Sequence, residues 1–348
     1  MSTTVLRDGS VYSPADPYAT AMVIQDGMVQ WVGSDAGAES ILDDSMQVEE
    51  LEGDLLAPAF AAAGIRVHPE DDLQDTVQKY RAAGYGALTF MLTPEALQQH
   101  HQHLTSLQDA AIYLEIEHLH QIPDHLSVQG ILLDPQGILE NETGMSLLDE
   151  AQARGLKAAL RADSSARIDA ALQIALKMDS LQRMKLALRL DGVTDLTESH
   201  ITQLSSMNVA LGFTSGPALQ KSALKAAITA GITSMLGSNP TQDSQLLGWE
   251  LALSMVSAGE SDHQLSARAT FAAMTKSCFR GMGHRNPLMG QLVPQAPATF
   301  CRWRADQLMV QTPDSRVAAW STDPRARIPL LPVLEAGNLP TLISLHHA

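Results

Sequence analysis

The feature that most constrains the fold of this sequence is an alternation of short apolar runs and amphipathic stretches, which begins near Leu55 and repeats eight times. Gly or a polar turn usually separates an amphipathic stretch from the next apolar run, as helix ends require. The apolar runs predict strands at 55–65, 86–92, 111–118, 128–134, 156–162, 185–191, 208–214 and 232–237. The amphipathic stretches predict helices at 70–83, 94–108, 142–154, 165–182, 197–206, 217–230, 241–258 and 266–283.

Eight strands with intervening helices favour a closed parallel barrel over an open sheet. We therefore predict an α/β fold in which residues 55–283 form a TIM-type (β/α)8 barrel. Only the third strand lacks a helix candidate after it.

The two ends of the chain, 1–54 and 284–348, have a β-type pattern instead. The turn signal Asp26-Gly27 between two β-prone runs predicts a hairpin over 19–34. Three further strands, expected at 298–303, 307–310 and 317–320, are predicted to pair with this hairpin. Both ends would then form one small β-sandwich-like domain.

Composition limits the partners of this chain of 348 residues. Hydrophobic residues make up 45%, which permits a large core, and no apolar run reaches the length of a membrane span. The net charge of −16 argues against nucleic-acid binding, which needs a basic face. The two cysteines, Cys278 and Cys301, make no disulfide framework, and no secretory signal is visible, so we expect a cytoplasmic protein.

The order of several short segments resembles the amidohydrolase superfamily of metal-dependent hydrolases. These segments include an opening hairpin with the family's "dG.i..vG" pattern, an "l.PGF"-like entry into the first strand and an "lGsDaP"-like end of the eighth. They lie at 21–33, 56–60, 189–193, 236–240 and 290–300. The resemblance implies a hydrolase of C–N bonds other than peptide bonds, with a metal at the end of the barrel where the strands finish.

The metal ligands that this resemblance implies are missing from the matching positions. The family uses two histidines on strand one, often Lys or Glu on strand four, a histidine each on strands five and six, and Asp on strand eight. The matching residues here are Gly64, Arg66, Leu132, Arg161, Gly192 and Asn239. Arginine stays protonated and cannot coordinate a cation, and one neutral amide cannot hold a divalent ion. We therefore expect no metal and no other cofactor.

Arg66 and Arg161 suggest what fills the vacated space. Two buried guanidinium groups need carboxylates, and the candidates at strand ends are Glu117, Asp134, Asp163 and Asp191. Alternatively, the two arginines, with Asn239, bind a small anionic ligand through its carboxylate or phosphate. Both readings stay open at the level of sequence.

Three functions follow from these residues. The first is a non-catalytic, ligand-binding pseudoenzyme, with self-association into a homo-oligomer left open. The second is an active hydrolase with a rebuilt site, which alone would need zinc or another divalent metal. The third is a metal-free lyase or isomerase with Asp191 as base and the arginines as oxyanion stabilisers. Because a hydrolytic water normally needs a metal at neutral pH, the first is favoured. The rebuilt site would draw on Glu117, His118, His120, Asp134, Asp163 and Asp191, with the two histidines on one face of a strand.

Overall fold

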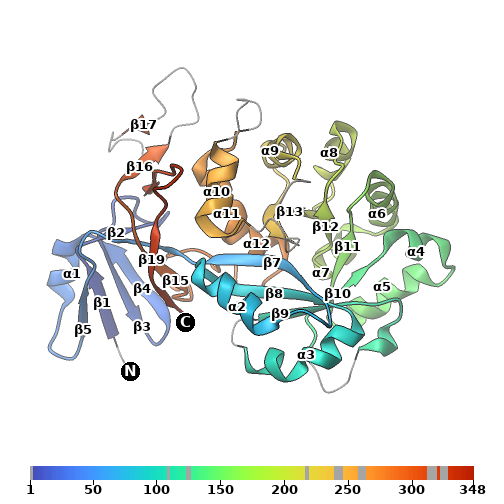
Figure 1. The fold of residues 1–348 in the computed structure, drawn as a ribbon, viewed down its shortest axis with the longest axis horizontal. Coiled ribbons are helices and arrows are strands. Elements are labelled where there is room, and N and C mark those ends of the chain that lie inside the picture. The colour runs from blue at the N-terminus through green and yellow to red at the C-terminus, as the bar shows by residue number, and fades with distance from the viewer. Residues whose placement is uncertain are drawn as a thin grey trace.

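The computed structural model of the chain contains a closed barrel of eight parallel strands, which confirms the predicted fold class (Figure 1). The structure describes residues 3–107, 110–122, 127–215, 219–238, 246–257, 264–311, 320–321 and 328–348. The barrel strands are β7 (Phe60–Val67), β8 (Tyr85–Leu92), β9 (Ala110–Glu115), β10 (Gly130–Leu133), β11 (Lys157–Arg161), β12 (Arg189–Val193), β13 (Ala210–Thr214) and β14 (Ser234–Ser238). They follow one another around the barrel in chain order, and β14 closes it by pairing with β7.

Helices surround the barrel and cover its strands (Figure 1). Their bounds are α2 (Leu73–Ala82), α3 (Pro94–Ser106), α4 (Pro135–Glu140), α5 (Gly144–Ala153), α6 (Ser165–Lys177), α7 (Ser180–Lys185), α8 (Glu198–Leu204), α9 (Lys221–Thr229), α10 (Gly248–Val256), α11 (Ala267–Met274) and α12 (Lys276–Gly281). Two expected helices are each divided: 165–182 forms α6 and α7, and 266–283 forms α11 and α12. The divisions fall at Asp179, which caps α7, and at Thr275, whose backbone is not helical. Among the described residues between β9 and β10 the one helical segment is a short 3-10 helix, Leu119–Gln121, in line with the lack of a helix candidate after the third strand.

Local sequence explains where these helices begin. The side chains of Asp72, Thr93, Asp134 and Ser164 accept hydrogen bonds from backbone N–H groups in the first turns of α2, α3, α4 and α6. In α3 and α4 a proline follows the cap directly, where its missing N–H costs nothing. These caps follow the carboxyl ends of strands, so they lie at the same end of the barrel as the functional candidates.

The small sheets contain strands from both ends of the chain. One sheet has the order β4-β3-β1-β5, another β19-β15-β6-β2 and a third β17-β16-β18. The members are β1 (Thr3–Arg7), β2 (Ser10–Val11), β3 (Ala21–Gln25), β4 (Met28–Gly33), β5 (Gln47–Glu50), β6 (Leu55–Pro58), β15 (Phe300–Arg304), β16 (Leu308–Gln311), β17 (Trp320–Ser321), β18 (Leu331–Pro332) and β19 (Thr341–His346), with helix α1 (Asp35–Ile41) between β4 and β5. The predicted hairpin is present as β3 and β4, which pair in antiparallel fashion.

The predicted pairing of this hairpin with the C-terminal strands is wrong. β15 pairs with β6 and β19, in a different sheet from the hairpin, which touches the C-terminal part through a bridge between Met28 and Pro297. β6 takes the place beside β15 because the expected strand 55–65 is divided at Ala59, so its first half joins the small sheet and its second half the barrel. Residues 317–319, expected in a strand, lie outside the described residues.

Side chains from the two four-stranded sheets pack in one apolar cluster that includes Met22, Leu56 and Phe300. Burial of this cluster joins the two ends of the chain although their strands lie in different sheets. No helix among the described residues is long and apolar enough to cross a membrane.

Candidate functional site

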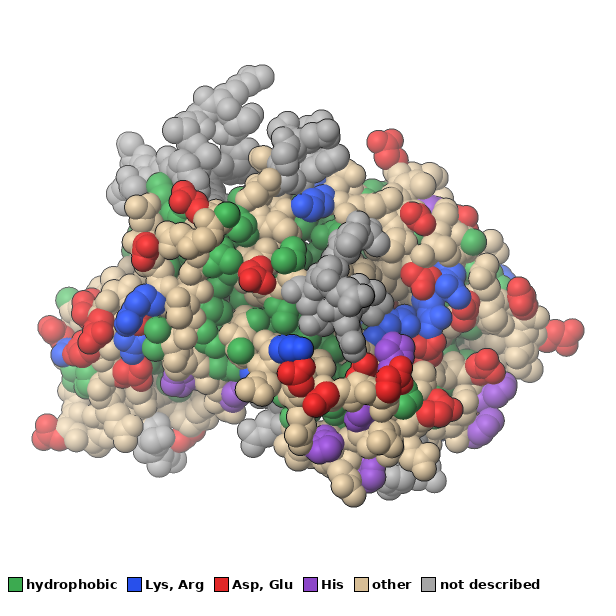
Figure 2. Space-filling view, in the orientation of Figure 1, with side chains coloured by type: hydrophobic (Ala, Val, Ile, Leu, Met, Phe, Trp, Pro, Cys, Tyr) green, Lys and Arg blue, Asp and Glu red, His purple; other side chains and the backbone are tan. Residues whose placement is uncertain are grey.

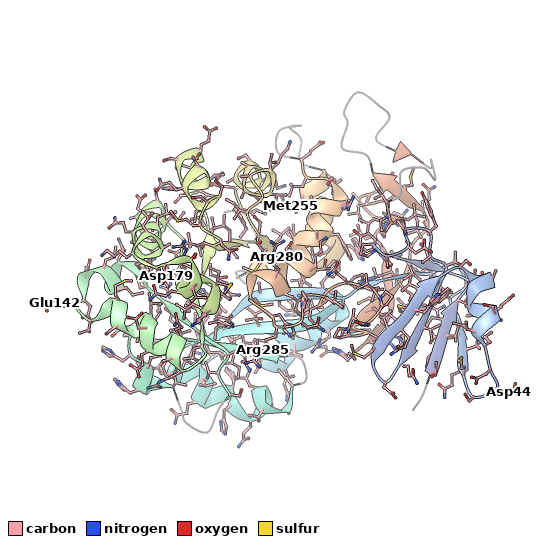
Figure 3. All side chains as sticks on the ribbon, turned by 180° about the vertical axis from the view of Figure 1, so that it is seen from behind. Asp44, Glu142, Asp179, Met255, Arg280 and Arg285 are labelled. Atoms are coloured by element: carbon pink, nitrogen blue, oxygen red, sulfur yellow. The ribbon has the colours of Figure 1, made fainter. Side chains whose placement is uncertain are left out.

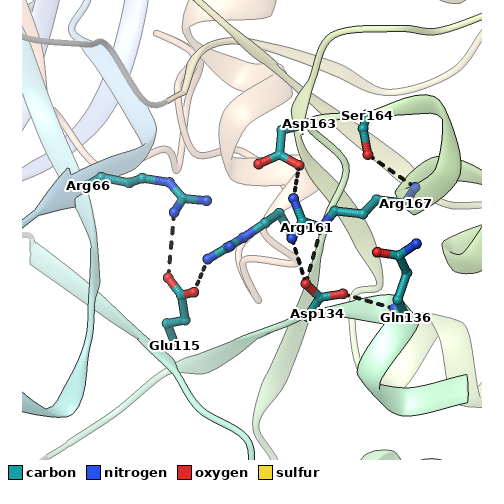
Figure 4. A network of polar contacts seen from close by, with 8 residues as sticks. All are labelled: Arg66, Glu115, Asp134, Gln136, Arg161, Asp163, Ser164 and Arg167. Atoms are coloured by element: carbon teal, nitrogen blue, oxygen red, sulfur yellow. Dashed lines mark hydrogen bonds and ion pairs between the residues drawn. The ribbon is translucent and has the colours of Figure 1, made fainter. Parts of the chain in front are cut away.

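Three charged side chains meet at the barrel mouth, the end where the strands finish. Arg66 on β7 and Arg161 on β11 both reach Glu115, the last residue of β9 (Figure 4). Nη1 of Arg66 lies 3.5 Å from Oε2 of Glu115, and Nη2 of Arg161 donates a hydrogen bond to Oε1. The side chains of Arg66, Arg161 and Glu115 are 21%, 19% and 34% exposed, so the group is half-buried. We call these three residues the arginine–glutamate triad.

The triad carries one positive charge in excess, because two guanidinium groups share one carboxylate. The Nε atoms of Arg66 and Arg161 are buried without a hydrogen-bond partner among the described residues. Burial and then the charge of Arg66 lower the pKa of Arg161 below its usual value. The two guanidinium groups therefore still repel each other across the shared carboxylate.

Two of the carboxylates expected beside these arginines serve a third arginine instead. Arg167, in the first turn of α6, donates from Nε and Nη2 to Oδ2 of Asp134 over 3.1 and 2.8 Å, and from Nη1 to Oδ1 of Asp163 over 2.6 Å (Figure 4). The spacing of four residues between Asp163 and Arg167 across a helix start is the signal that could have revealed this pairing.

The third expected counterion, Asp191, lies deeper in the barrel and pairs with Arg189 on the same strand. The two side chains are fully buried, with Arg189 Nε 3.8 Å from Asp191 Oδ1. Arg189 also donates to the carbonyl of Ala63 over 2.9 Å and lies 4.4 Å from the centre of the Tyr113 ring. Arg189 and Asp191 are two residues apart, so both point to the same side of β12. The fourth expected counterion, Glu117, is exposed.

Five of the six positions that the resemblance aligns with metal ligands are described, and their side chains offer no atom that coordinates a cation: Gly64, Arg66, Leu132, Arg161 and Gly192. A Cβ atom on Gly64 would lie 3.0 Å from Met91 Cε and 3.2 Å from Asp191 Oδ2, so other side chains fill that space. Leu132 is fully buried in an apolar cluster, and Gly192 has a positive φ of 77° in an irregular part of β12. Asn239 lies outside the described residues. Within the described part of the chain no three His, Cys, Asp or Glu side chains are grouped to hold a metal ion.

A cavity of about 710 Å³ opens beside the triad. Arg161 and Glu115 line it together with Glu117, His118 and Asp134, which sequence reasoning named for a rebuilt site. Apolar side chains form another part of the wall: Pro94, Ile116, Leu133, Ile138 and Leu147. Figure 2 shows basic and acidic side chains gathered together over the ends of β10 and β11 and the start of α6. The cavity thus combines an apolar wall with a charged end.

His118 and His120 do not lie on one face of a strand as expected. β9 ends at Glu115, His118 precedes the 3-10 helix, and His120 lies within it. Their exposed rings stack with centroids 5.3 Å apart and planes tilted by 15°. The strand ends early because the amide oxygen of Gln121 accepts hydrogen bonds from the backbone N–H groups of Glu117 and His118.

Several solved structures with a similar fold are named as hydrolases. An N-isopropylammelide isopropylaminohydrolase from Burkholderia multivorans superposes with a TM-score of 0.63 at 16% identity, covering 88% of this chain and 93% of that one. An amidohydrolase from an environmental sample of the Sargasso sea gives 0.66 at 10% identity, over 99% and 91%. An atrazine chlorohydrolase from Arthrobacter aurescens, complexed with zinc and atraton, gives 0.61 at 13% identity, over 89% and 90%. No family model and no curated protein matches the sequence.

These likenesses extend over most of the chain but rest on few identical residues, so they establish the fold alone. This chain has an eight-stranded parallel barrel and small sheets built from the chain ends, and it shares its overall fold with solved structures named as amidohydrolases. Function has to be argued from the site.

Proposed function

We propose that this protein is a non-catalytic, ligand-binding member of the amidohydrolase fold in which the arginine–glutamate triad replaces the metal centre. The observation that carries the proposal is the meeting of Arg66 and Arg161 at Glu115. The resemblance aligns both arginines with metal-ligand positions of the amidohydrolase superfamily, and their charges repel a divalent cation.

The excess positive charge of the triad favours a ligand with one carboxylate. Glu95, Glu117 and Asp134 also line the cavity, so an anion is attracted only at the triad end, and these carboxylates disfavour an anion with two or more charges. The apolar wall around Ile116, Leu133 and Ile138 suits an apolar body. We therefore propose a small apolar monocarboxylate as the ligand, with Arg161 as its main contact.

Calorimetric titration of benzoate and isobutyrate into the protein tests this proposal. Arg161→Gln is expected to weaken binding at least about tenfold, since it removes a charge-assisted hydrogen bond. Glu117→Gln, which removes a carboxylate from the same wall, is the matched control and is expected to bind equally well or better. Equal affinity in the wild type and in Arg161→Gln, or no saturable binding of either probe, would overturn the proposed ligand.

A rebuilt hydrolase is the second candidate, because Glu117, His118 and Asp134 all line the cavity. Its substrates would be sought among N-alkyl triazines such as those named for the structural neighbours. Turnover that is lost in both Glu117→Gln and His118→Gln but retained in His103→Gln, at an exposed position of α3, would establish catalysis and replace the non-catalytic proposal.

A further inference from the structure

A second cavity, of about 400 Å³, lies at the end of the barrel opposite the mouth. Its wall contains Leu188, Val209 and Thr233, each of which directly precedes a barrel strand. The end of α12 forms another part of the wall. None of the described residues that line this cavity is acidic, although the chain carries 39 acidic residues.

Basic side chains collect at this cavity. Arg183 and Arg280 line it, and Lys157 lies against its wall, because its Cε is 3.7 Å from the place of a Cβ on Gly283. Burial, and then the charge of Arg285 nearby, lowers the pKa of Lys157. Figure 3, which shows the molecule from behind, places Arg280 and Arg285 near the middle of the barrel on that side.

These cations have no acidic partner among the described residues. None of Lys157, Arg183, Arg280 and Arg285 forms an ion pair with a described carboxylate. Elsewhere in the described chain, Arg7, Arg154, Arg167 and Arg302 all have such partners. In a chain with a net charge of −16, a group of unpaired cations around one cavity calls for a separate explanation.

The partial negative charge at helix C-termini offsets only part of the positive charge at this cavity. Arg183 donates from Nε to the carbonyl of Met207 over 2.9 Å and from Nη1 to the carbonyls of Ala175 and Met178, so it stabilises the ends of neighbouring elements. A helix C-terminus carries about half a negative charge, which a nearby cation offsets. Arg280 lies in the last turn of α12, but its guanidinium group is exposed and bonds to no described residue. Positive charge therefore remains in excess.

We propose that this cavity binds a small oxyanion, namely the phosphate or carboxylate group of a small molecule, with Arg280 as its main charged contact. The planar guanidinium fork matches the geometry of such groups. The amide of Asn208 and the hydroxyl of Thr233 lie on the same wall and supply neutral donors. Arg285 and Lys157 add to the local potential. This site is separate from the triad and does not depend on the function proposed for the mouth.

Calorimetric titration of inorganic phosphate at low ionic strength tests the proposal. The variant R280Q/R285Q removes two exposed side chains without an ion pair, so the fold is expected to persist, as thermal melts would verify. The control R7Q/K79Q removes the same total charge elsewhere, from the ion pairs of Arg7 with Glu39 and Glu50 and of Lys79 with Asp75. Phosphate is expected to bind the wild type and the control alike, and to bind R280Q/R285Q at least about tenfold more weakly.

Three outcomes would overturn the proposal. Phosphate could fail to bind the wild type saturably, or it could bind R280Q/R285Q as tightly as the control. The third outcome is that Arg161→Gln abolishes phosphate binding while R280Q/R285Q does not, which would show that phosphate binds at the barrel mouth. Titration of citrate in the same series separates a preference for phosphate from one for carboxylates, and either preference supports the site.

Discussion

Replacing Glu115 by glutamine should leave two guanidinium groups at the barrel mouth without a counterion. Unit charges 3.5 Å apart attract by about 5 kcal/mol at an effective dielectric constant of about 20. Desolvation offsets much of this gain, and pairs cost about 3–5 kcal/mol to break when buried but at most about 1 kcal/mol when exposed. Because the triad is one-fifth to one-third exposed, we expect Glu115→Gln to lower the free energy of unfolding by about 2 kcal/mol.

Urea unfolding monitored by circular dichroism measures this effect. The control is Glu117→Gln, which removes an exposed carboxylate two residues away and should change stability by less than about 0.5 kcal/mol. The double variant E115Q/R161Q should be more stable than E115Q alone, since it removes the repulsion between the two arginines. Wild-type stability in E115Q, or a double variant less stable than E115Q, would refute the reasoning.

The other predictions concern the neighbours of the triad and the buried thiols. Gly64→Ala should destabilise the protein by about 1–3 kcal/mol by overpacking against Met91 and Asp191, whereas Gly137→Ala, in open space on α4, should leave stability unchanged or raise it in the same urea assay. Acetate should raise the melting temperature of Glu115→Ala more than chloride does at equal ionic strength, because it can replace the lost carboxylate; equal effects of the two salts would contradict this. Burial raises the pKa of the Cys278 thiol to about 12, whereas an unfolded cysteine has a pKa of about 8.5. Above pH 8.5 the unfolded chain therefore loses the thiol proton while the folded protein keeps it. The stability that the buried neutral thiol contributes is complete below pH 8.5 and is lost as the pH rises further. Urea midpoints between pH 7 and 10 should therefore fall faster above pH 8.5 in the wild type than in Cys278→Ala, and parallel curves would count against this.

The barrel could be predicted from the sequence because its signals are local and repeated. Buried parallel strands form continuous apolar runs, and caps such as Thr93 and Ser164 mark where helices start. Which sheet a short strand joins depends on distant partners, and the sequence holds no local signal for them. Hence the pairing of β15 with β6, rather than with the hairpin, could not be predicted.

The sequence predicted which arginines lie at the candidate site, but it did not predict which carboxylates pair with them. Arg66 and Arg161 were identified because the resemblance aligns them with metal-ligand positions of the amidohydrolase superfamily. Glu115 was missed as their counterion, because several carboxylates follow strand ends and only three-dimensional geometry decides among them. Arg167, in the first turn of α6, forms ion pairs with Asp134 after β10 and Asp163 after β11. Arg189 pairs with Asp191 inside the barrel. Asn239 stays an untested prediction because it lies outside the described residues.

The metal content of the purified protein tests the central claim most directly. The protein would be expressed in medium supplemented with zinc and manganese, purified without chelators and analysed by inductively coupled plasma mass spectrometry. If the arginine–glutamate triad replaces the metal centre, every divalent transition metal should be far below one equivalent per chain, in the wild type and in Arg161→Gln alike. About one equivalent of zinc, manganese, iron or nickel in the wild type, retained through gel filtration, would contradict the account.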